Sequence, residues 1–218
     1  HSEGEDVRSL TRGRGSGVAG VREFRWDPDR GEIDPEALAG LDAAVHLAGE
    51  NIGARRWNAR VRARLRESRL RGTGLLAESL ARATPPPATL LTASAVGIYG
   101  DRGDEPLTED APPGRGFLAD LCREWEAAAE PAARAGIRVV RLRTATVLTR
   151  AGGALPRMLL PFRLGLGARF GHGRQYFSWI AAEDVVPAIQ WLLAHPGVDG
   201  PVNLAAPQAV TNAEFTRT

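Results

Sequence analysis

Arg12 lies at a position in the sequence where its side chain could bind the phosphate of a nucleotide. Arg12 follows a short β-like run at residues 7–10, and a second candidate strand covers residues 21–26. In dinucleotide-binding folds, a basic side chain just after the second strand can pair with the adenosine 2′-phosphate, whereas an acidic one bonds the ribose hydroxyls. Arg12 therefore favours NADP over NAD. The alternative is an arginine in a solvated loop.

Apart from histidine, the basic side chains are all arginines, because the sequence contains no lysine. Schiff-base chemistry and lysine-assisted proton transfer are therefore excluded within this chain. Eight arginines lie between Arg55 and Arg71, and on a helix they could hold the phosphates of a substrate or of a nucleic-acid backbone. A solvated helix face is the alternative. The formal net charge of +2 gives little reason to expect a polyanion as partner.

The composition is that of a soluble globular protein, with 43% hydrophobic and 25% charged residues among 218. The only cysteine, Cys122, can form no internal disulfide and has no neighbour at metal-ligand spacing, so no metal site is expected. The first residues lack the apolar core of a signal peptide, and no apolar run approaches the roughly 18 residues of a membrane span. We expect a cytoplasmic protein that does not bind membranes.

Strands and helices alternate along the chain. Apolar runs predict strands at residues 43–49, 88–95 and 137–142, and the stretches beside them predict helices at 34–41, 58–83 and 117–135. Parallel strands need crossover connections, and helices supply them. The alternation therefore predicts an α/β fold with a doubly wound parallel sheet.

The character of the sequence changes near residue 152, where glycines, aromatic residues and a helix-like apolar piece follow. We therefore expect a Rossmann-type dinucleotide-binding domain over residues 1–150 and a smaller substrate-side region over residues 151–218. An amphipathic helix at about residues 183–194 is expected to interleave with this region as a late Rossmann helix. The chain is also expected to stop inside its substrate region.

The phosphate-binding fingerprint of such a fold is absent, since no strand leads through G-x-G-x-x-G into a helix. Gly13-x-Gly15-x-Gly17 opens no helix, and the glycines near Gly165 stand in another context. Either the protein binds no dinucleotide, or its first strand, glycine loop and first helix precede His1. We favour the second, because HSEGEDVRSLTR is similar to the end of that helix followed by the second strand.

Several long segments resemble the atypical epimerase-like family within the extended short-chain dehydrogenases/reductases. They are AAVHLAGENIGARRW, ASAVGIYGDRGDEPLTED, GFLADLCREWEAAA, RVVRLRTATVL and GGALPRMLLPFRLGLG. The resemblance covers nearly the whole chain. It implies a Rossmann-type fold, a bound NAD(P) and a kinship with sugar-nucleotide epimerases.

The resemblance also implies which residues lie beside the cofactor. They are Leu47, Ala48 and Gly49 by the ribose and pyrophosphate, Thr92, Ala93 and Ser94 by the nicotinamide ribose, and Arg143, Thr144 and Ala145 by the carboxamide. Small residues after the fourth strand let the backbone approach the cofactor closely. Tight packing is the alternative role for those small residues.

The usual catalytic pair of these relatives is missing. They use a Tyr-x-x-x-Lys helix, in which the lysine lowers the pKa of the tyrosine so that a phenolate can exchange a proton. Aligned through Glu126, the two positions are Leu118 and Cys122. Neither residue can replace that pair, and Cys122 is expected to fill space beside the nicotinamide. The assisting serine of relatives falls on Ala95 or, with a one-residue offset, on Ser94.

Three other side chains are candidates for proton transfer: Ser94, Tyr99 and Glu50. Glu50 directly follows the cofactor turn and could be an acid/base group or a ribose contact, with a plain loop carboxylate as the alternative. Tyr99 could donate a proton. Its alternative is a buried structural tyrosine whose hydroxyl is paired.

These features predict an NADP-binding, epimerase- or oxidoreductase-like protein of the extended short-chain dehydrogenase superfamily. Its partner would be a small molecule such as a sugar nucleotide or a carbonyl compound. The alternative is a noncatalytic NADP-sensing or scaffold protein that has lost the tyrosine and lysine. An RNA-binding role for the arginine-rich helix ranks third, because that helix matches the family's helix packed near the cofactor.

Overall fold

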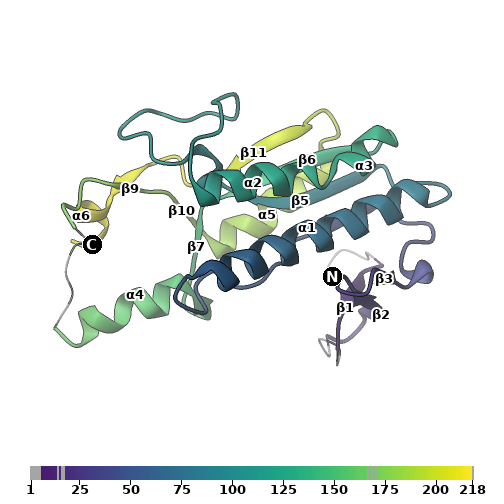
Figure 1. The fold of residues 1–218 in the computed structure, drawn as a ribbon, viewed down its shortest axis with the longest axis horizontal. Helices are drawn as coiled ribbons and strands as arrows, with labels where there is room; N and C mark the ends of the chain where they lie inside the picture. Colours follow the sequence, from purple (N-terminus) through teal and green to yellow (C-terminus); the bar gives the residue numbers. More distant parts are fainter. Residues whose placement is uncertain are drawn as a thin grey trace. The chain divides into compact units, whose positions relative to one another are not determined.

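The protein divides into two compact units. The structure is a computed structural model that describes residues 6–13, 15, 18–165, 167, 169 and 171–217. Unit 1 comprises His1–Thr92 with Glu124–Val139, and unit 2 comprises Ala93–Arg123 with Val140–Thr218 (Figure 1). The sequence Gly13-x-Gly15-x-Gly17 was not expected to open a helix. Its last glycine, Gly17, lies outside the described residues.

A small sheet opens unit 1. In it, β1 (Arg8–Thr11) pairs in parallel with β2 (Arg22–Asp27), and β3 (Glu32–Ile33) runs antiparallel to β2. The first two strands confirm the prediction. The helix expected at residues 34–41 is wrong in length, since only the 3-10 helix η1 (Pro35–Ala37) forms there. Gly40 has a φ of +63°, which is not helical backbone.

The core of unit 1 forms where α1 (Ala59–Arg82) packs beside β4 (Ala43–His46) and β5 (Thr89–Ala95), which pair in parallel. Asn58 caps α1 by accepting a hydrogen bond from the Val61 backbone N–H at 2.9 Å. The strand expected at residues 43–49 ends at His46, and the next three residues are exposed and have no regular secondary structure. The buried apolar side chains of the core include Leu76, Leu80, Leu90, Ala129 and Val139.

One helix expected at residues 117–135 is two helices, α2 (Phe117–Ala127) and α3 (Glu130–Arg134). Pro131 lies at the start of α3 and has no backbone N–H. A continuous helix would need that N–H to bond the Ala127 carbonyl, so the ladder breaks there. The single-helix prediction was therefore wrong, although the overall helical content was right.

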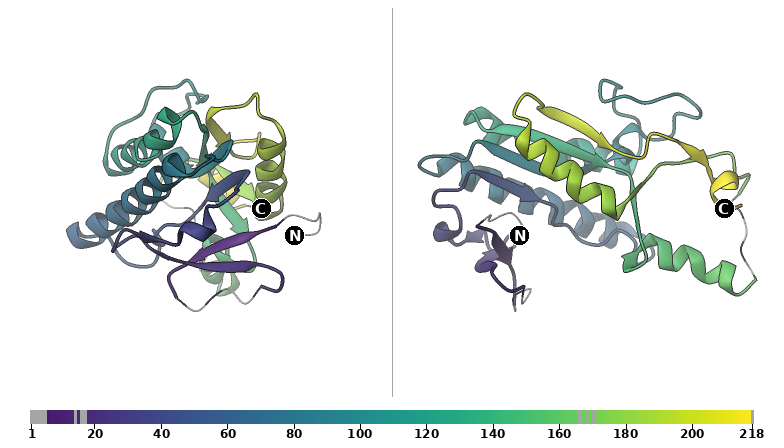
Figure 2. Two further views of the ribbon diagram at one scale, coloured as in Figure 1. Left: turned by 90° about the vertical axis from the view of Figure 1, so that its right-hand side faces the viewer. Right: turned by 180° about the vertical axis from the view of Figure 1, so that it is seen from behind.

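The strands β6 (Arg138–Thr144) and β11 (Gly200–Leu204) pair in parallel in unit 2, with α5 (Ala182–Ala194) beside them (Figure 2). The main sheet has the strand order β11-β6-β5-β4. This parallel sheet with crossover helices confirms the predicted α/β class. Helix α5 confirms the helix predicted at about residues 183–194.

The remaining elements of unit 2 are short. They are η2 (Val96–Tyr99), β7 (Thr146–Thr149), β8 (Gly152–Gly153), α4 (Ala154–Arg163), β9 (Tyr176–Phe177), β10 (Trp179–Ala181), β12 (Val210–Thr211) and α6 (Asn212–Phe215). β7 pairs in parallel with β10, and β12 pairs antiparallel with β9. Within the described part of the chain, no helix combines the length and apolar character needed to cross a membrane.

Candidate functional site

The turn after β4 carries the first group of predicted site residues. Parallel strands place their carboxyl ends at one edge of a sheet, where ligands of open α/β folds bind. Leu47, Ala48 and Gly49 are all exposed at this edge. The Glu50 backbone anchors the turn to α1, because its N–H donates to Ser68 Oγ at 3.2 Å and its carbonyl accepts from Arg69 Nη1 at 3.2 Å.

The Arg69 side chain connects this segment to α1 through its hydrogen bond to the Glu50 carbonyl. It is buried, it also donates to the Leu65 carbonyl at 3.1 Å, and its guanidinium lies 4.9 Å from the centroid of the Trp125 ring. The Trp125 indole N–H donates in turn to Thr73 Oγ1 at 2.8 Å. The sequence placed Arg69 in a cluster of arginines on a helix expected to pack near the cofactor. It did not predict the contact with Trp125, because a residue 56 positions away leaves no local signal.

The Glu50 side chain forms an ion pair with Arg64. The carboxylate is half-buried. The side chain is therefore engaged by a protein group, and both roles expected of Glu50, acid/base group and ribose contact, stay predictions.

Arg12 lies at the end of β1, and its side chain is exposed. Among the described residues no carboxylate forms an ion pair with it. The neighbouring turn is ordered by a hydrogen bond from the Gly13 N–H to Thr11 Oγ1 at 3.3 Å. An exposed guanidinium without an acidic partner fits a phosphate, so the residue type and its surroundings agree with a 2′-phosphate site.

The carboxyl end of β5 contributes Thr92, Ala93 and Ser94. The Thr92 side chain is fully buried and its Oγ1 has no hydrogen-bond partner among the described residues, so the hydroxyl does not reach solvent. Any contact of Thr92 with a cofactor must therefore be made by its main chain. Ser94 is also buried, with 3% of its surface exposed.

Among the candidate catalytic residues, Tyr99 has a hydroxyl that makes two hydrogen bonds to other side chains. Its ring is buried with 3% exposed, its hydroxyl donates to Asn203 Oδ1 at 2.7 Å, and it accepts from Arg143 Nη1 at 3.0 Å. The Arg143 guanidinium also lies 5.2 Å from the centroid of the tyrosine ring. Both hydrogen-bonding roles of the hydroxyl are thus taken by protein groups, which is the arrangement of a structural tyrosine.

The same network holds the loop that follows η2. Arg143 Nη1 donates to the Glu109 carbonyl at 2.8 Å, and the Glu109 carboxylate accepts from the Asn203 backbone N–H at 2.8 Å. The Asn203 side-chain amide donates to the Leu107 carbonyl at 3.4 Å. Residues 100–116 are therefore fastened to β6 and β11 at their middle. Neither Asn203 nor Glu109 was selected from the sequence.

The residues after Arg143 make backbone and local contacts. Thr144 Oγ1 donates to the Leu142 carbonyl at 3.1 Å, and the Ala145 N–H donates to the Leu204 carbonyl at 2.9 Å. Ala145 is buried with 6% exposed. In unit 2 these three residues thus continue β6 toward its carboxyl end, where the resemblance expects the cofactor's carboxamide.

Leu118 and Cys122, the two positions at which the resemblance expects the catalytic pair of relatives, both lie on α2 and carry apolar side chains. Leu118 is 37% exposed and its Cβ would lie 3.5 Å from a Cβ added at Gly97. Cys122 is 3% exposed and packs with Ile98 and Tyr99. The thiol is therefore a member of a small hydrophobic cluster, and its place beside the nicotinamide stays a prediction.

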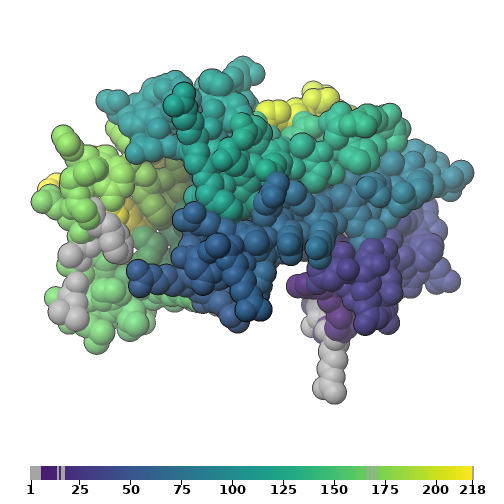
Figure 3. Space-filling view, viewed as in Figure 1, coloured from purple at the N-terminus to yellow at the C-terminus, as the bar shows by residue number. Residues whose placement is uncertain are grey.

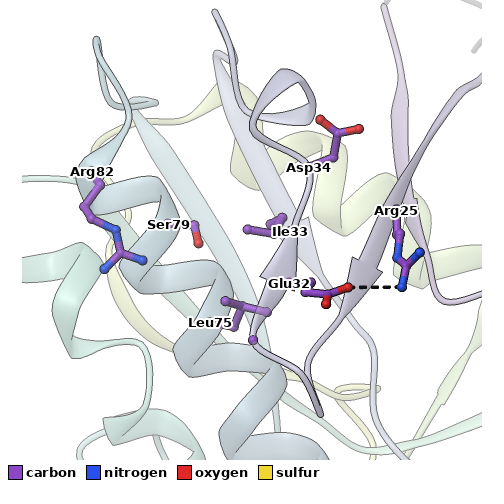
Figure 4. Close-up of a pocket in the computed structure, with 8 residues that line it drawn as sticks. Arg25, Glu32, Ile33, Asp34, Leu75, Ser79 and Arg82 are labelled. Atoms are coloured by element: carbon purple, nitrogen blue, oxygen red, sulfur yellow. Dashed lines mark ion pairs between the residues drawn. The ribbon is translucent and has the colours of Figure 1, made fainter.

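A cavity of about 390 Å³ lies in unit 1 away from these residues (Figure 4). It lies between the β2–β3 hairpin and the second half of α1, and Arg25, Gly31, Glu32, Ile33, Asp34, Leu75, Ser79 and Arg82 line it. Arg25 pairs with Glu32 at 3.1 Å, Arg82 pairs with Glu78 at 3.6 Å, and Asp34 caps η1. Its charged groups are thus engaged, and it holds none of the candidate catalytic residues.

Comparison with known proteins decides the family. The model of the NAD dependent epimerase/dehydratase family matches residues 20–205. The chain belongs to this family. It is 50% identical over 198 residues to the epimerase family protein Mb2239 of Mycobacterium bovis, covering 91% of this chain and 65% of that protein. It is 38% identical over 221 residues to the human epimerase family protein SDR39U1, covering 100% of this chain and 72% of that protein.

Solved structures of the epimerase family agree with the fold. The human SDR39U1 (isoform2) crystallised with NADPH is 36% identical, with a TM-score of 0.84 over 98% of this chain and 70% of that one. The nucleoside-diphosphate sugar epimerase from Corynebacterium glutamicum is 36% identical, with a TM-score of 0.81 over 97% of this chain and 48% of that one. The chain spans 65% of the length of the mycobacterial relative.

Proposed function

We propose that this chain is part of an NADP-binding, epimerase- or oxidoreductase-like protein of the extended short-chain dehydrogenase superfamily. Residues 1–150 would form the dinucleotide-binding domain and residues 151–218 the substrate side. The observation that carries the proposal is the exposed Arg12 without an acidic partner among the described residues. It is supported by the NADPH held by the human relative of the same fold.

The cofactor, when bound, supplies hydride chemistry. The chain would provide the turn Leu47–Glu50 for the ribose and pyrophosphate, the ends of β5 and β6 for the nicotinamide side, and Arg12 for the 2′-phosphate. Cys122 would fill space beside the nicotinamide. The substrate would be a small molecule, and sugar nucleotides and carbonyl compounds are the classes to screen. The name of the Corynebacterium relative supports the first of these classes.

A noncatalytic sensor or scaffold is the second candidate function, and one observation favours it. By alignment through Glu126, Leu118 and Cys122 stand at the positions of the usual tyrosine and lysine. Leu118 is 37% exposed, and Cys122 packs in a small hydrophobic cluster. Tyr99 is held by Asn203 and Arg143. The test is to purify the full-length protein and to assay hydride transfer to a panel of carbonyl compounds and sugar nucleotides. Bound NADP without hydride transfer supports the sensor. Turnover of any member of the panel supports the enzyme.

Replacing Arg12 by Ala should weaken NADPH binding to the full-length protein by about tenfold or more and leave NADH binding unchanged. The expected size is that of a charge-assisted hydrogen bond to phosphate, about 1.5–3 kcal/mol. Fluorescence titration with both dinucleotides measures it. Arg30→Ala, which removes another exposed arginine of unit 1, serves as the matched control. An equal loss for both dinucleotides in R12A contradicts a 2′-phosphate contact.

Cys122→Ala should keep kcat within roughly tenfold of the unaltered enzyme, once a substrate is known. A thiol carries no permanent positive charge and Leu118 offers no phenol to activate, so the thiol has no acid/base partner at that position. Loss of a true acid/base group costs about a hundredfold or more. A decrease of that size in a variant that folds and binds NADPH would make the thiol catalytic.

A further inference from the structure

The second half of α4 exposes apolar side chains of the kind that usually lie inside a protein. Leu160, Phe162 and Leu164 have 58%, 39% and 64% of their surface exposed, and the residues between them are exposed too. No residue of α4 is buried, and the main contacts of the helix are with β7 and β8. Residues 154–164 lie on the molecular surface, in green (Figure 3).

This exposed segment differs from an ordinary surface helix. A surface helix turns its apolar side chains to the core and its polar side chains to water. Here the five successive residues from Leu160 to Leu164 are all exposed, and three of them are large and apolar. Removing such side chains from water is favourable, so a contiguous group of them marks a surface that another part of a protein covers.

The charge around α4 indicates the chemistry of the covering surface. From Arg150 to Arg174 the chain carries five arginines and no aspartate or glutamate. Arg163 lies within the exposed segment, and among the described residues no carboxylate forms an ion pair with it. A surface that brings carboxylates together with apolar side chains would complement both the charge and the exposed apolar groups.

A second copy of the chain does not supply that chemistry through the same face. A symmetric dimer places each surface patch against its own copy. Two α4 helices would then bring their arginines together without any carboxylate between them, and like charges placed face to face oppose association. The occupant must therefore come from a different stretch of sequence.

We propose that a segment of the protein's own chain that follows Thr218 covers α4, and that this segment is acidic and amphipathic. Both α4 and α6 belong to unit 2, so the chain that continues past α6 starts in the unit that carries the exposed face. The match to the mycobacterial relative covers 65% of that protein, so about a third of it lies outside the match. The inference rests on the proposal that this chain is part of a longer protein, and it is independent of NADP binding.

Photo-cross-linking of the full-length protein tests which segment covers α4. Benzoylphenylalanine in place of Leu164 attaches on irradiation to groups in contact with it, and mass spectrometry identifies the attached peptide. We expect cross-links within one molecule to residues after Thr218. Benzoylphenylalanine in place of Glu78, an exposed residue of α1 in unit 1, is the control and should not label that segment.

The outcomes of cross-linking are distinct. Cross-links from position 164 only to residues before Thr218, cross-links to a second molecule, or no cross-link at all overturn the proposal. Equal labelling of the later segment from position 78 also overturns it, because the contact would then not be specific to α4. Failure of the protein to bind NADP changes none of these results.

Two substitutions at Leu160 test the charge of the covering segment. On a helix in water, aspartate at this position should be more favourable than lysine, because Arg157 and Arg163 lie three residues before and after it. Against an acidic segment the order reverses. We expect Leu160→Asp in the full-length protein to lower the Tm by about 5 °C or more relative to the control Gln190→Asp, and Leu160→Lys to lower it less.

Gln190 is exposed on α5, so its replacement adds the same charge to another helix of unit 2. A Tm of L160D equal to or above that of L160K overturns the acidic segment. Should neither charged variant fold, the cross-links decide alone. A dimer that L160D converts to a monomer in sedimentation assigns the face to a second copy, and binding to anionic phospholipid vesicles that L160D abolishes assigns it to a membrane; either result overturns the proposal.

Discussion

Gly114→Ala should destabilise the protein by about 3 kcal/mol or more. A Cβ at this position would lie 2.1 Å from the Tyr99 carbonyl oxygen and 2.9 Å from Gly100 Cα. These are backbone atoms that no rotamer change can move, so the loop must shift and give up the hydrogen bond from the Gly114 N–H to the Ile98 carbonyl at 2.8 Å. Urea unfolding followed by circular dichroism measures the loss.

Gly74→Ala is the matched control for this substitution. Gly74 lies inside α1, and nothing lies within 4 Å of a Cβ added there. Alanine is favoured over glycine in a helix by about 1 kcal/mol, so this variant should be as stable as the unaltered protein or more stable. If G114A unfolds at the same urea concentration as the unaltered protein, the close packing of residues 100–116 against η2 is not as described.

Lowering the pH to about 4 should reduce the free energy of unfolding by about 3 kcal/mol because of one buried histidine, His46. Burial lowers the pKa of His46 to about 4 from an ordinary value of 6.5, and its Nε2 has no hydrogen-bond partner among the described residues. Below pH 6.5 the unfolded chain takes up a proton that the folded protein refuses until about pH 4. The contribution of His46 to the free energy of unfolding is therefore fully present above pH 6.5. It is lost progressively as the pH decreases to about 4.

The measurement compares free energies of unfolding at about pH 7 and about pH 4.5 in the unaltered protein and in His46→Leu. Carboxylates contribute to acid destabilisation in both, so the difference between the two slopes isolates His46. His172→Asn, at an exposed histidine, should retain the slope of the unaltered protein. A slope that is the same in H46L and the unaltered protein would falsify the assignment to this side chain.

Local signals predicted the parts of the fold that local chemistry determines. The sequence predicted both ends of α1. A stretch without proline begins at Asn58, and prolines follow Ala83. The break between α2 and α3 was missed although Pro131 was visible, because a proline in a helical pattern can stand at the start of a second helix as well as end a region. Strands of two to four residues, such as β8 and β7, are too short to show a period.

Residue type and position at a strand end are the local signals on which the site predictions at Arg12 and after β4 rest, and these stay predictions. The network around Tyr99 was not predictable, because its hydroxyl bonds Asn203, which is 104 positions away, and Asn203 bonds Glu109 across 94 positions. Such pairs exist only once β6 and β11 are side by side. An unpaired tyrosine and a satisfied one have the same sequence, so only the fold distinguishes them.

We propose that the protein binds NADP at a site to which Arg12 contributes. Titration of purified full-length protein with NADPH and with NADH, followed by cofactor fluorescence, tests it most directly. We expect saturable NADPH binding that is about tenfold or more tighter than NADH binding, because only NADPH brings a 2′-phosphate to the Arg12 guanidinium. Equal affinity for the two dinucleotides, or no binding of either, would contradict the account.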